Sequence, residues 1–155
     1  MAVKATYDKC LVRDPEEGDA LALYKELRVE DMLEIIGLDH HPWAAVSMSA
    51  RLSEKCFTMT TADGDMVAMF GATKTHVPSV GCVWMLGTDR VRGMRIDFVR
   101  NCKEWLAELM GEHRCLINVV STSNKISMRW LKWLGAEFLR EQPKGYLEFM
   151  IPRID

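Results

Sequence analysis

The chain has 155 residues, a formal net charge of −2 and a sequence pI near 6.1, and 48% of its residues are hydrophobic. This length favours a single domain over residues 1–155 with a sizeable core. The charge gives no electrostatic case for a nucleic-acid partner, and no apolar run approaches the ~20 residues that span a bilayer, so we expect neither a membrane anchor nor a secretory signal peptide.

The cysteines and histidines predict neither a disulfide framework nor a metal site. The five cysteines are odd in number, lack a Cys-x-x-Cys spacing and lie mostly in apolar runs, which is typical of free thiols in a reducing compartment. His40 and His41 have no carboxylate or cysteine at ligand spacing nearby, so we interpret them as structural or solvated histidines at a break between helices.

The first 55 residues predict one strand followed by helices. Residues 5–13 favour a strand. Asp14 and Pro15 then form a helix-start signature, a capping residue followed by proline in the first turn. Helical character continues over residues 28–38 and returns over residues 43–55.

A β-hairpin follows. Residues 56–61 and 66–72 are rich in strand-forming side chains, and Asp63-Gly64 between them supplies the positive φ that tight hairpin turns require. Gly71, inside the return strand, indicates a bulge or a close approach of backbone.

The next segment combines a buried strand, a basic bend and a helix. Residues 82–87 are an apolar run, and a glycine-containing bend follows with arginines at 90, 92 and 95. From Phe98 to Met110 the apolar positions share one helical face. A helix start behind a basic bend presents free backbone N–H groups to an anion, so the bend is either an anion site or a solvated surface turn.

A second strand and helix complete this segment. Residues 115–120 read as a buried strand that contains Asn118, whose amide either bonds the neighbouring backbone or faces a pocket, because an unsatisfied buried amide is costly. Asn124 is a predicted cap for a helix over residues 125–134, and Gly135 is a predicted C-terminal cap.

The tryptophans and the arginine of that helix are expected to have structural roles. Trp130 and Trp133 share a face with Leu134 and are expected to pack in the core. Arg129 is expected to hydrogen-bond within the fold. The chain then predicts two closing strands, one at Phe138-Leu139 and one over residues 146–151, which gives an α/β (α+β) fold.

These residues resemble a known family. Arg90-x-x-Gly93-x-Arg95 is similar to the pyrophosphate loop of the GNAT (Gcn5-related N-acetyltransferase) family, and the helix after Asn124 is similar to its later helix motif. The string from Trp84 to Asp89, with Asn-x-x-Ser-x-Arg-Trp-Leu-x-Trp-Leu-Gly at 124–135, resembles more narrowly a GNAT-like group of tailed phages that includes internal virion protein A of short-tailed coliphages.

The resemblance implies a three-layer α/β/α fold with a mixed, mostly antiparallel sheet and one splayed parallel strand pair. It also implies a site for acetyl-CoA or CoA, and no metal. The implied coenzyme-binding residues are Met85, Leu86, Gly87, Arg90, Arg92, Gly93, Met94, Arg95, Asn118 and Asn124.

Two positions depart from the family pattern. Arg95 stands where the family has Gly or Ala, and Leu131 stands at the position of the usual tyrosine acid. Leucine has no proton to donate, which puts ordinary GNAT chemistry in doubt. Asp89 and Glu30 are the candidate bases for an amine acceptor, since a carboxylate near the thioester is what that step needs.

Three functions remain open, the third of which is a CoA-sensing or protein-binding module. The first is a virion-associated phage protein, internal, ejected or involved in assembly, with a degenerate acetyl-CoA site and weak or no catalysis. The second is an active acetyl-CoA-dependent N-acetyltransferase for a host protein or a small amine. Expected partners are other virion proteins or a host protein, and the expected location is the host cytoplasm, the virion or both.

Overall fold

A computed structural model describes residues 3–7 and 9–154; within it, the side chains of Arg95, Asp97 and Phe98 are not described. The described strands form one eight-stranded sheet in the order β1-β2-β3-β4-β5-β6-β8-β7. Their bounds are β1 Val3–Thr6, β2 Leu11–Arg13, β3 Ser53–Thr60, β4 Met66–Lys74, β5 Val80–Gly87, β6 Cys115–Ser121, β7 Glu137–Glu141 and β8 Tyr146–Pro152.

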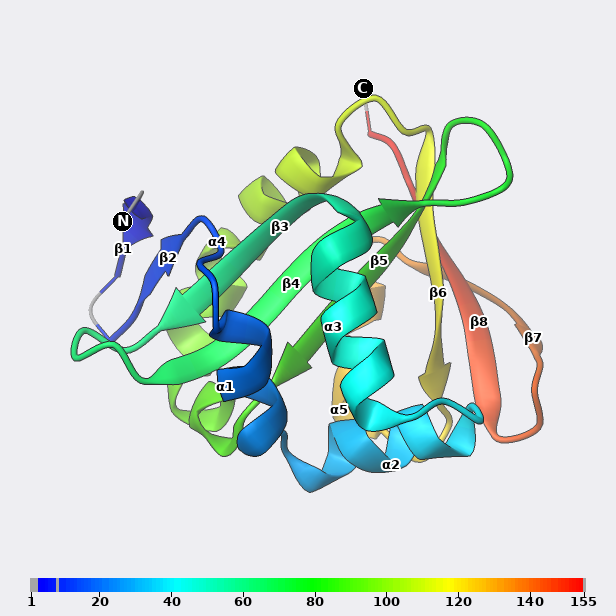
Figure 1. Cartoon of the computed structure of the whole chain (residues 1–155). Coiled ribbons are helices and arrows are strands. Elements are labelled where there is room, and N and C mark those ends of the chain that lie inside the picture. The colour runs from blue at the N-terminus through cyan, green and yellow to red at the C-terminus, as the bar shows by residue number, and fades with distance from the viewer. Residues whose placement is uncertain (1–2, 8, 155) are drawn as a thin grey trace.

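Helices cover both faces of this sheet (Figure 1). Helices α1, α2 and α3 lie on one face and α4 and α5 on the other, so the chain forms three layers. The helix bounds are α1 Asp19–Lys25, α2 Val29–Gly37, α3 Pro42–Leu52, α4 Arg95–Met110 and α5 Lys125–Trp133, and a 3-10 helix, η1, covers Asp89–Met94. No described helix is both long and apolar enough to cross a membrane.

The sheet is antiparallel except where β5 meets β6, and that parallel pair is a fork. Val80, Gly81 and Cys82 pair with Cys115, Leu116 and Ile117, and the register ends there. Beyond that point β5 stays on β4 up to Gly87, and β6 stays on β8 up to Ser121, so the two strands diverge along the rest of their length (Figure 1). The predicted splayed pair is confirmed.

Each face of the sheet has its own core. Along β5, side chains alternate between the faces, as strand geometry requires. Val83 and Met85 pack with the α4–α5 cluster, whereas Trp84 and Leu86 pack with the α1–α3 cluster. The gap of the fork therefore connects two apolar layers.

The N-terminal elements differ from the predictions. Residues 5–13 form the two antiparallel strands β1 and β2 and not one strand. The first helix begins at Asp19, not Asp14, because the Asp19 carboxylate accepts bonds from Arg13 (2.8 and 2.9 Å), Thr58 (2.8 Å) and the backbone N–H of Glu16 (2.8 Å). These partners fix the first helical turn next to the sheet. Burial alone would raise the pKa of Asp19, but those bonds outweigh burial and lower it.

The third helix ends three residues earlier than predicted. Residues 53–55 belong to β3 and pair with Thr73 and Ala72 of β4. Gly71 of β4 confirms the predicted close approach, since a Cβ there would lie 2.7 Å from the Lys55 carbonyl oxygen. His41 has a structural role, because its Nδ1 accepts a hydrogen bond from the Trp43 N–H (3.1 Å) at the start of α3.

The last helix follows the predicted caps. Asn124 Oδ1 accepts from the Ser127 N–H (3.2 Å), and Gly135 has a φ of +95°. The Ala136 and Gly135 N–H groups bond the Leu131 and Lys132 carbonyls, which is the Schellman pattern.

The two tryptophans of α5 have different environments. Trp130 packs on the α4–α5 core cluster, but Trp133 is 48% exposed. Three residues advance a helix by about 300°, so Trp133 lies past the edge of the inward face. The core prediction for Trp133 is wrong.

Candidate functional site: the fork between β5 and β6

The diverging ends of β5 and β6 enclose a cavity of about 330 Å³. Apolar side chains from both strands and from α3, α4 and α5 line most of it, among them Met85 and Leu131. Its polar lining includes Asp31, Glu34, His40, Ser49, Asn118 and Ser127. A pocket of this size with a few converging polar groups has the general form of a small-molecule site.

Asn118 bridges the two strands where they separate. Its Nδ2 donates to the Val83 carbonyl of β5, and its Oδ1 accepts from the Val119 N–H of its own strand (2.8 Å). Asn118 also lines the cavity. Both interpretations of this buried amide are thus correct, because it bonds the neighbouring backbone and faces the pocket.

The far end of β5 is closed by the start of α2. The Gly87 N–H donates to Asp31 Oδ2 (2.8 Å), and the Gly87 carbonyl accepts from the Arg28 N–H (2.9 Å). Arg28 also donates to Asp31 through Nε (2.9 Å), so the buried carboxylate is held on two sides. The outward backbone groups of Gly87 are therefore engaged within the chain.

Met85 offers the free backbone on this strand. Hydrogen-bonding groups alternate between the two sides of an antiparallel strand. Val83 and Gly87 direct their carbonyls away from β4, so Met85 between them does the same, whereas Leu86 faces β4. Of the three strand residues implied as coenzyme contacts, Met85 alone keeps its N–H and C=O directed into the open part of the gap.

The end of β6 is closed by Glu34 of α2. Glu34 Oε1 accepts from the Ser121 N–H (3.4 Å) and from Asn124 Nδ2 (3.2 Å). Burial is the main reason that the pKa of Glu34 is raised above its ordinary value of 4.5, and the Asn124 bond lowers it in part. A carboxylate with a raised pKa keeps its proton to higher pH than an exposed one and is a stronger base once it is ionised.

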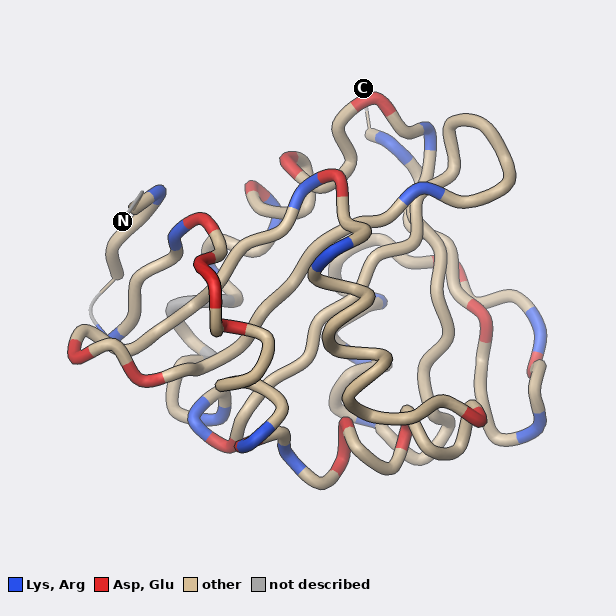
Figure 2. Tube along the Cα trace, in the orientation of Figure 1, with Lys and Arg blue, Asp and Glu red and all other residues tan. Residues whose placement is uncertain are grey.

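Glu34 and Asp31 complete the polar lining of the site, and Glu34 was not predicted as a catalytic residue from the sequence. They lie on α2 at a spacing of three, with Ile35 and Leu38 on the same side. Acidic residues at helical spacing within an apolar face are the sequence signal that points to them. Figure 2 shows the acidic positions along α2 at the lower edge of the molecule.

The two predicted bases lie elsewhere. Glu30 is exposed and accepts from Arg92 Nη2 (3.0 Å), and Asp89 is exposed at the start of η1. Neither residue lines the cavity. Their catalytic roles stay predictions.

The basic bend has a different form from the expected anion cradle. It is the 3-10 helix η1, and the N–H groups of Arg90 and Val91 donate to the side chain and the carbonyl of Thr88 (3.3 and 3.1 Å). The expectation of free amides is wrong at these two positions, because the bend winds into α4 as a continuous helix.

The arginines of the bend are also engaged. Arg90 Nη1 contacts Glu26 (3.0 Å) and Arg92 contacts Glu30 (3.0 Å), so acids of the α1–α2 region partly neutralise them. Both ion pairs are exposed, and a ligand anion would compete with them on the surface. Met94 is buried, Gly93 has open space around its Cα, and the predicted contact of Arg95 falls on a side chain outside the described part of the chain.

Leu131 occupies the position implied for a tyrosine acid. It is buried and lines the cavity from α5. Tyr146 lies near this end of the fork, but its hydroxyl donates to the Glu34 backbone carbonyl (3.0 Å) and it is not part of the cavity lining. Among the described residues, no group of three or more His, Cys, Asp or Glu is arranged to hold a metal ion.

Solved structures similar to this one are GNAT acetyltransferases. The GNAT domain of S. lividans PAT matches with a TM-score of 0.68 and 15% identity over 93% of this chain and 90% of that one. A GCN5-related N-acetyltransferase from Kribbella flavida gives 0.68 and 16% over 93% and 98%. Diaminobutyrate acetyltransferase EctA from Paenibacillus lautus, solved with its substrate and coenzyme A, gives 0.67 and 19% over 94% and 96%.

These likenesses establish the fold, which is the GNAT fold with its mixed sheet and splayed strand pair. No individually curated protein matches the sequence. One family profile does, over residues 57–142, and its description is "Bacteriophage T7, probable scaffold protein Gp13". Because that match spans more than half of the residues, this chain, which has a GNAT fold, belongs to the phage T7 Gp13 family.

Proposed function

We propose that this phage protein acts in or on the virion, as an internal, ejected or assembly component, and that its coenzyme site no longer supports acetyl transfer. The observation that carries the proposal is that the chain's own side chains bond several of the backbone groups that border the fork. Asn118, Asp31 and Glu34 bond backbone groups of β5 and β6 that border the gap. In a coenzyme-binding fork those groups would be available to a pantetheine chain.

Three further features support the loss of catalysis. Leu131 cannot protonate a leaving thiolate. The N–H groups of Arg90 and Val91 are already bonded to Thr88, and the side chains of Arg90 and Arg92 are paired with carboxylates. Each feature weakens a different part of the reaction, which is why together they favour a structural role. The family match and the resemblance to internal virion protein A support the virion as the place of action.

An active acetyltransferase is the second candidate. The cavity of about 330 Å³ and the outward backbone of Met85 leave room for an acyl-pantetheine end. Glu34, with its raised pKa, would then be the base that receives the proton of an amine acceptor. In this case Glu34 replaces Asp89 and Glu30 as the predicted catalytic carboxylate.

Ligand-dependent melting separates the two candidates. At a coenzyme concentration of ~100 times Kd, binding adds roughly 2.7 kcal/mol to the stability, which is readily visible for a domain of this size. We expect no shift of the melting temperature with acetyl-CoA or CoA. A shift together with thiol release in the presence of amines would establish the enzyme and reject the proposal.

Two companion measurements sharpen the result. We expect Leu131→Tyr to release no thiol from acetyl-CoA, because several backbone groups that border the fork remain bonded within the chain and a single acid does not create an acceptor site. Mass spectrometry of purified phage particles tests the location directly. Absence of the protein from virions and from assembly intermediates would contradict the virion role.

A further inference from the structure

Helix α4 carries opposite charge on its two exposed sides. At about 100° per residue, Glu104 and Glu108 lie on one side of the inward face, and Arg100 and Lys103 lie on the other. Trp105 lies inward on the acidic side and contacts Phe57 of β3, with ring centroids 4.9 Å apart. The helix therefore separates an acidic surface from a basic one.

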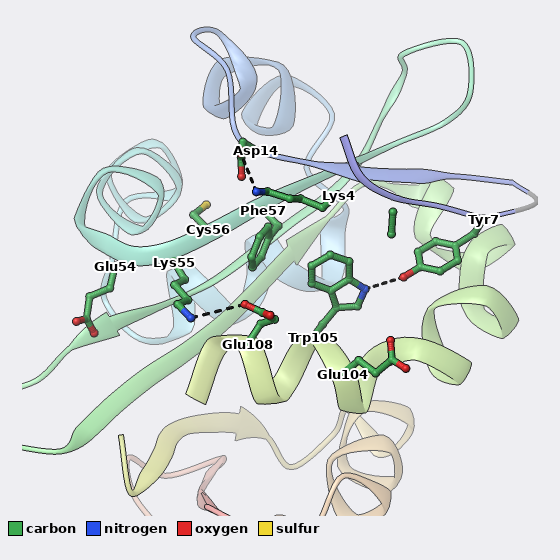
Figure 3. Close-up of a pocket in the computed structure, with 11 residues that line it drawn as sticks. Lys4, Tyr7, Asp14, Glu54, Lys55, Cys56, Phe57, Glu104, Trp105 and Glu108 are labelled. Carbon is green, nitrogen blue, oxygen red and sulfur yellow. Dashed lines mark hydrogen bonds and ion pairs between the residues drawn. The ribbon is translucent and has the colours of Figure 1, made fainter. Parts of the chain in front are cut away.

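The acidic side opens on a groove between α4 and the strands β1 and β3 (Figure 3). The groove holds about 570 Å³, and an aromatic wall of Tyr7, Phe57 and Trp105 forms part of it, with Trp105 Nε1 donating to the Tyr7 hydroxyl (2.9 Å). A volume of this size suits the insertion of several side chains.

The charges of this groove are unbalanced. Its lining contains four carboxylates and two lysines, which gives a net charge of −2. Lys4 pairs with Asp14 and Lys55 with Glu108, both at 3.6 Å. Glu54 contacts Lys74 (3.8 Å) and His113 Nε2 (2.7 Å), which lie outside the lining. Glu104 makes no ion pair with any residue that the structure describes. The groove thus presents aromatic surface with a negative rim.

The basic side of α4 continues onto the outer face of α5. We call this surface the basic ridge, and its members are Arg100, Lys103, Lys125, Arg129, Lys132, Ile126 and Trp133. Lys103 Nζ lies 4.4 Å from the Trp133 ring centroid, which joins the two helices at this surface. Ile126 is 61% exposed.

The cations of the basic ridge have no carboxylate partner among residues 3–7 and 9–154. The expectation that Arg129 hydrogen-bonds within the fold is wrong, since its side chain is exposed and makes no such bond there. Among the members of the ridge, Arg100, Arg129 and the exposed Trp133 are of residue types that are enriched at protein interfaces.

We propose that the basic ridge of one copy of this chain docks into the acidic groove of a second copy. The charges are complementary, and the exposed Trp133 and Ile126 meet a groove with an aromatic wall. Because the ridge and the groove are different surfaces of one molecule, the contact is head-to-tail. An open assembly therefore keeps one unused groove at one end and one unused ridge at the other. This self-association lies outside the fork and does not depend on whether coenzyme binds.

A second copy fits these observations better than nucleic acid. The chain as a whole carries a net charge of −2, which opposes long-range attraction to a polyanion. The acidic counterpart that the ridge needs is present on the same molecule, next to it across α4. Binding of an oligonucleotide by a protein that stays monomeric is therefore an outcome that overturns the proposal.

Sedimentation velocity on two complementary double variants tests the contact. The groove variant is Glu104→Lys with Glu108→Lys, and the ridge variant is Arg129→Glu with Lys132→Glu. We expect the wild type to associate with increasing concentration and to dissociate at high salt, because exposed charges are screened. Each double variant alone should associate at least tenfold more weakly.

Mixing the two variants is the decisive step. The groove variant keeps an intact ridge and the ridge variant keeps an intact groove, and their mutated surfaces carry reversed and still opposite charges. The mixture should therefore recover the association that each variant loses alone. Self-association of either double variant alone, a mixture that stays monomeric, or a wild type that is monomeric at all concentrations would overturn the head-to-tail contact.

Matched controls separate the contact from net charge. Lys25→Glu with Lys144→Glu changes the charge as much as the ridge variant, and Glu17→Lys with Glu112→Lys as much as the groove variant; all four positions are exposed and lie outside both surfaces. Both controls should associate like the wild type. Circular dichroism and thermal unfolding of every variant verify that the fold is retained.

Discussion

In the fork between β5 and β6, Asn118, Asp31 and Glu34 bond the chain's own backbone. On the basic ridge, by contrast, five cations have no carboxylate partner among the side chains that the structure describes. The resemblance implies a coenzyme site at the fork, and here the bordering backbone groups of Val83, Gly87 and Ser121 are bonded within the chain. The ridge is a surface where polar groups remain available. The contrast predicts that substitutions in the fork change stability, while substitutions on the ridge change the proposed contact between copies.

Removing the Asp31 carboxylate should be the largest perturbation of this contrast. Asp31→Ala leaves the buried Gly87 N–H and the Arg28 guanidinium without their acceptor, and breaking a buried pair costs about 3–5 kcal/mol. Urea unfolding measures the loss. Glu30→Gln, on the exposed neighbouring position, is the control and should change stability by less than about 0.5 kcal/mol. Equal effects at both positions would mean that the fork is not a stabilising element.

Asn118 should give the next largest effect. Asn118→Ala leaves the Val83 carbonyl and the Val119 N–H unbonded at the branch point, and each unsatisfied buried group costs about 1–3 kcal/mol. Hydrogen exchange of the amides of β5 and β6 would locate the opening. Faster exchange confined to the hairpin of β3 and β4, with the fork unchanged, would contradict the bridging role.

The pH dependence of stability tests the role of Glu34 in the fork. Its folded pKa lies above the ordinary value of 4.5, mainly because of burial, so the folded state binds its proton more tightly than the unfolded chain does. Stability contributed by this group is therefore present below 4.5 and falls as pH rises through the folded pKa. Glu34→Gln keeps an acceptor for the Ser121 N–H and should remove this fall.

Thermal unfolding from pH 4 to 8 checks the Glu34 effect against Glu17→Gln, an exposed control. The control should follow the wild-type profile, and only the Glu34 variant should gain relative stability as pH rises. A Glu34→Gln stability profile parallel to that of the wild type would show that burial does not raise the pKa of this carboxylate.

The smallest effect on stability should come from the basic ridge. Arg129→Ala removes an exposed cation that has no ion-pair partner in the described part of the chain, so the free energy of unfolding should change by less than about 0.5 kcal/mol. Chemical denaturation provides the measurement. A loss above 1 kcal/mol would place Arg129 in the folding core and weaken the distinction between fork and ridge.

The elements that the sequence predicted well are those with strong local signals. Asp63-Gly64 lies in the turn between β3 and β4, Asn124 caps α5, and Gly135 ends it. The start of α1 was missed because Asp14-Pro15 is a local capping signal, whereas Asp19 is fixed by Arg13 and Thr58 from two strands. A local pattern carries no information about such distant partners.

The candidate site shows the same limit. The resemblance placed Met85, Asn118 and Leu131 in one region, and the structure brings all three to one cavity. It did not indicate that Glu34 reaches Ser121 and Asn124, 87 and 90 residues away in the chain. It also assigned free amides to a bend whose 3-10 winding depends on bonds to Thr88.

By itself, the sequence determined most of the alternation of strands and helices, the caps of the last helix and the absence of an acidic side chain at position 131, which is leucine, because these depend on neighbouring residues and on residue type. Only the tertiary structure decided how far β5 and β6 separate, which carboxylates enter the gap and which cations stay without partners. Those features depend on packing between segments far apart in the chain, and no local pattern contains the distances that fix them.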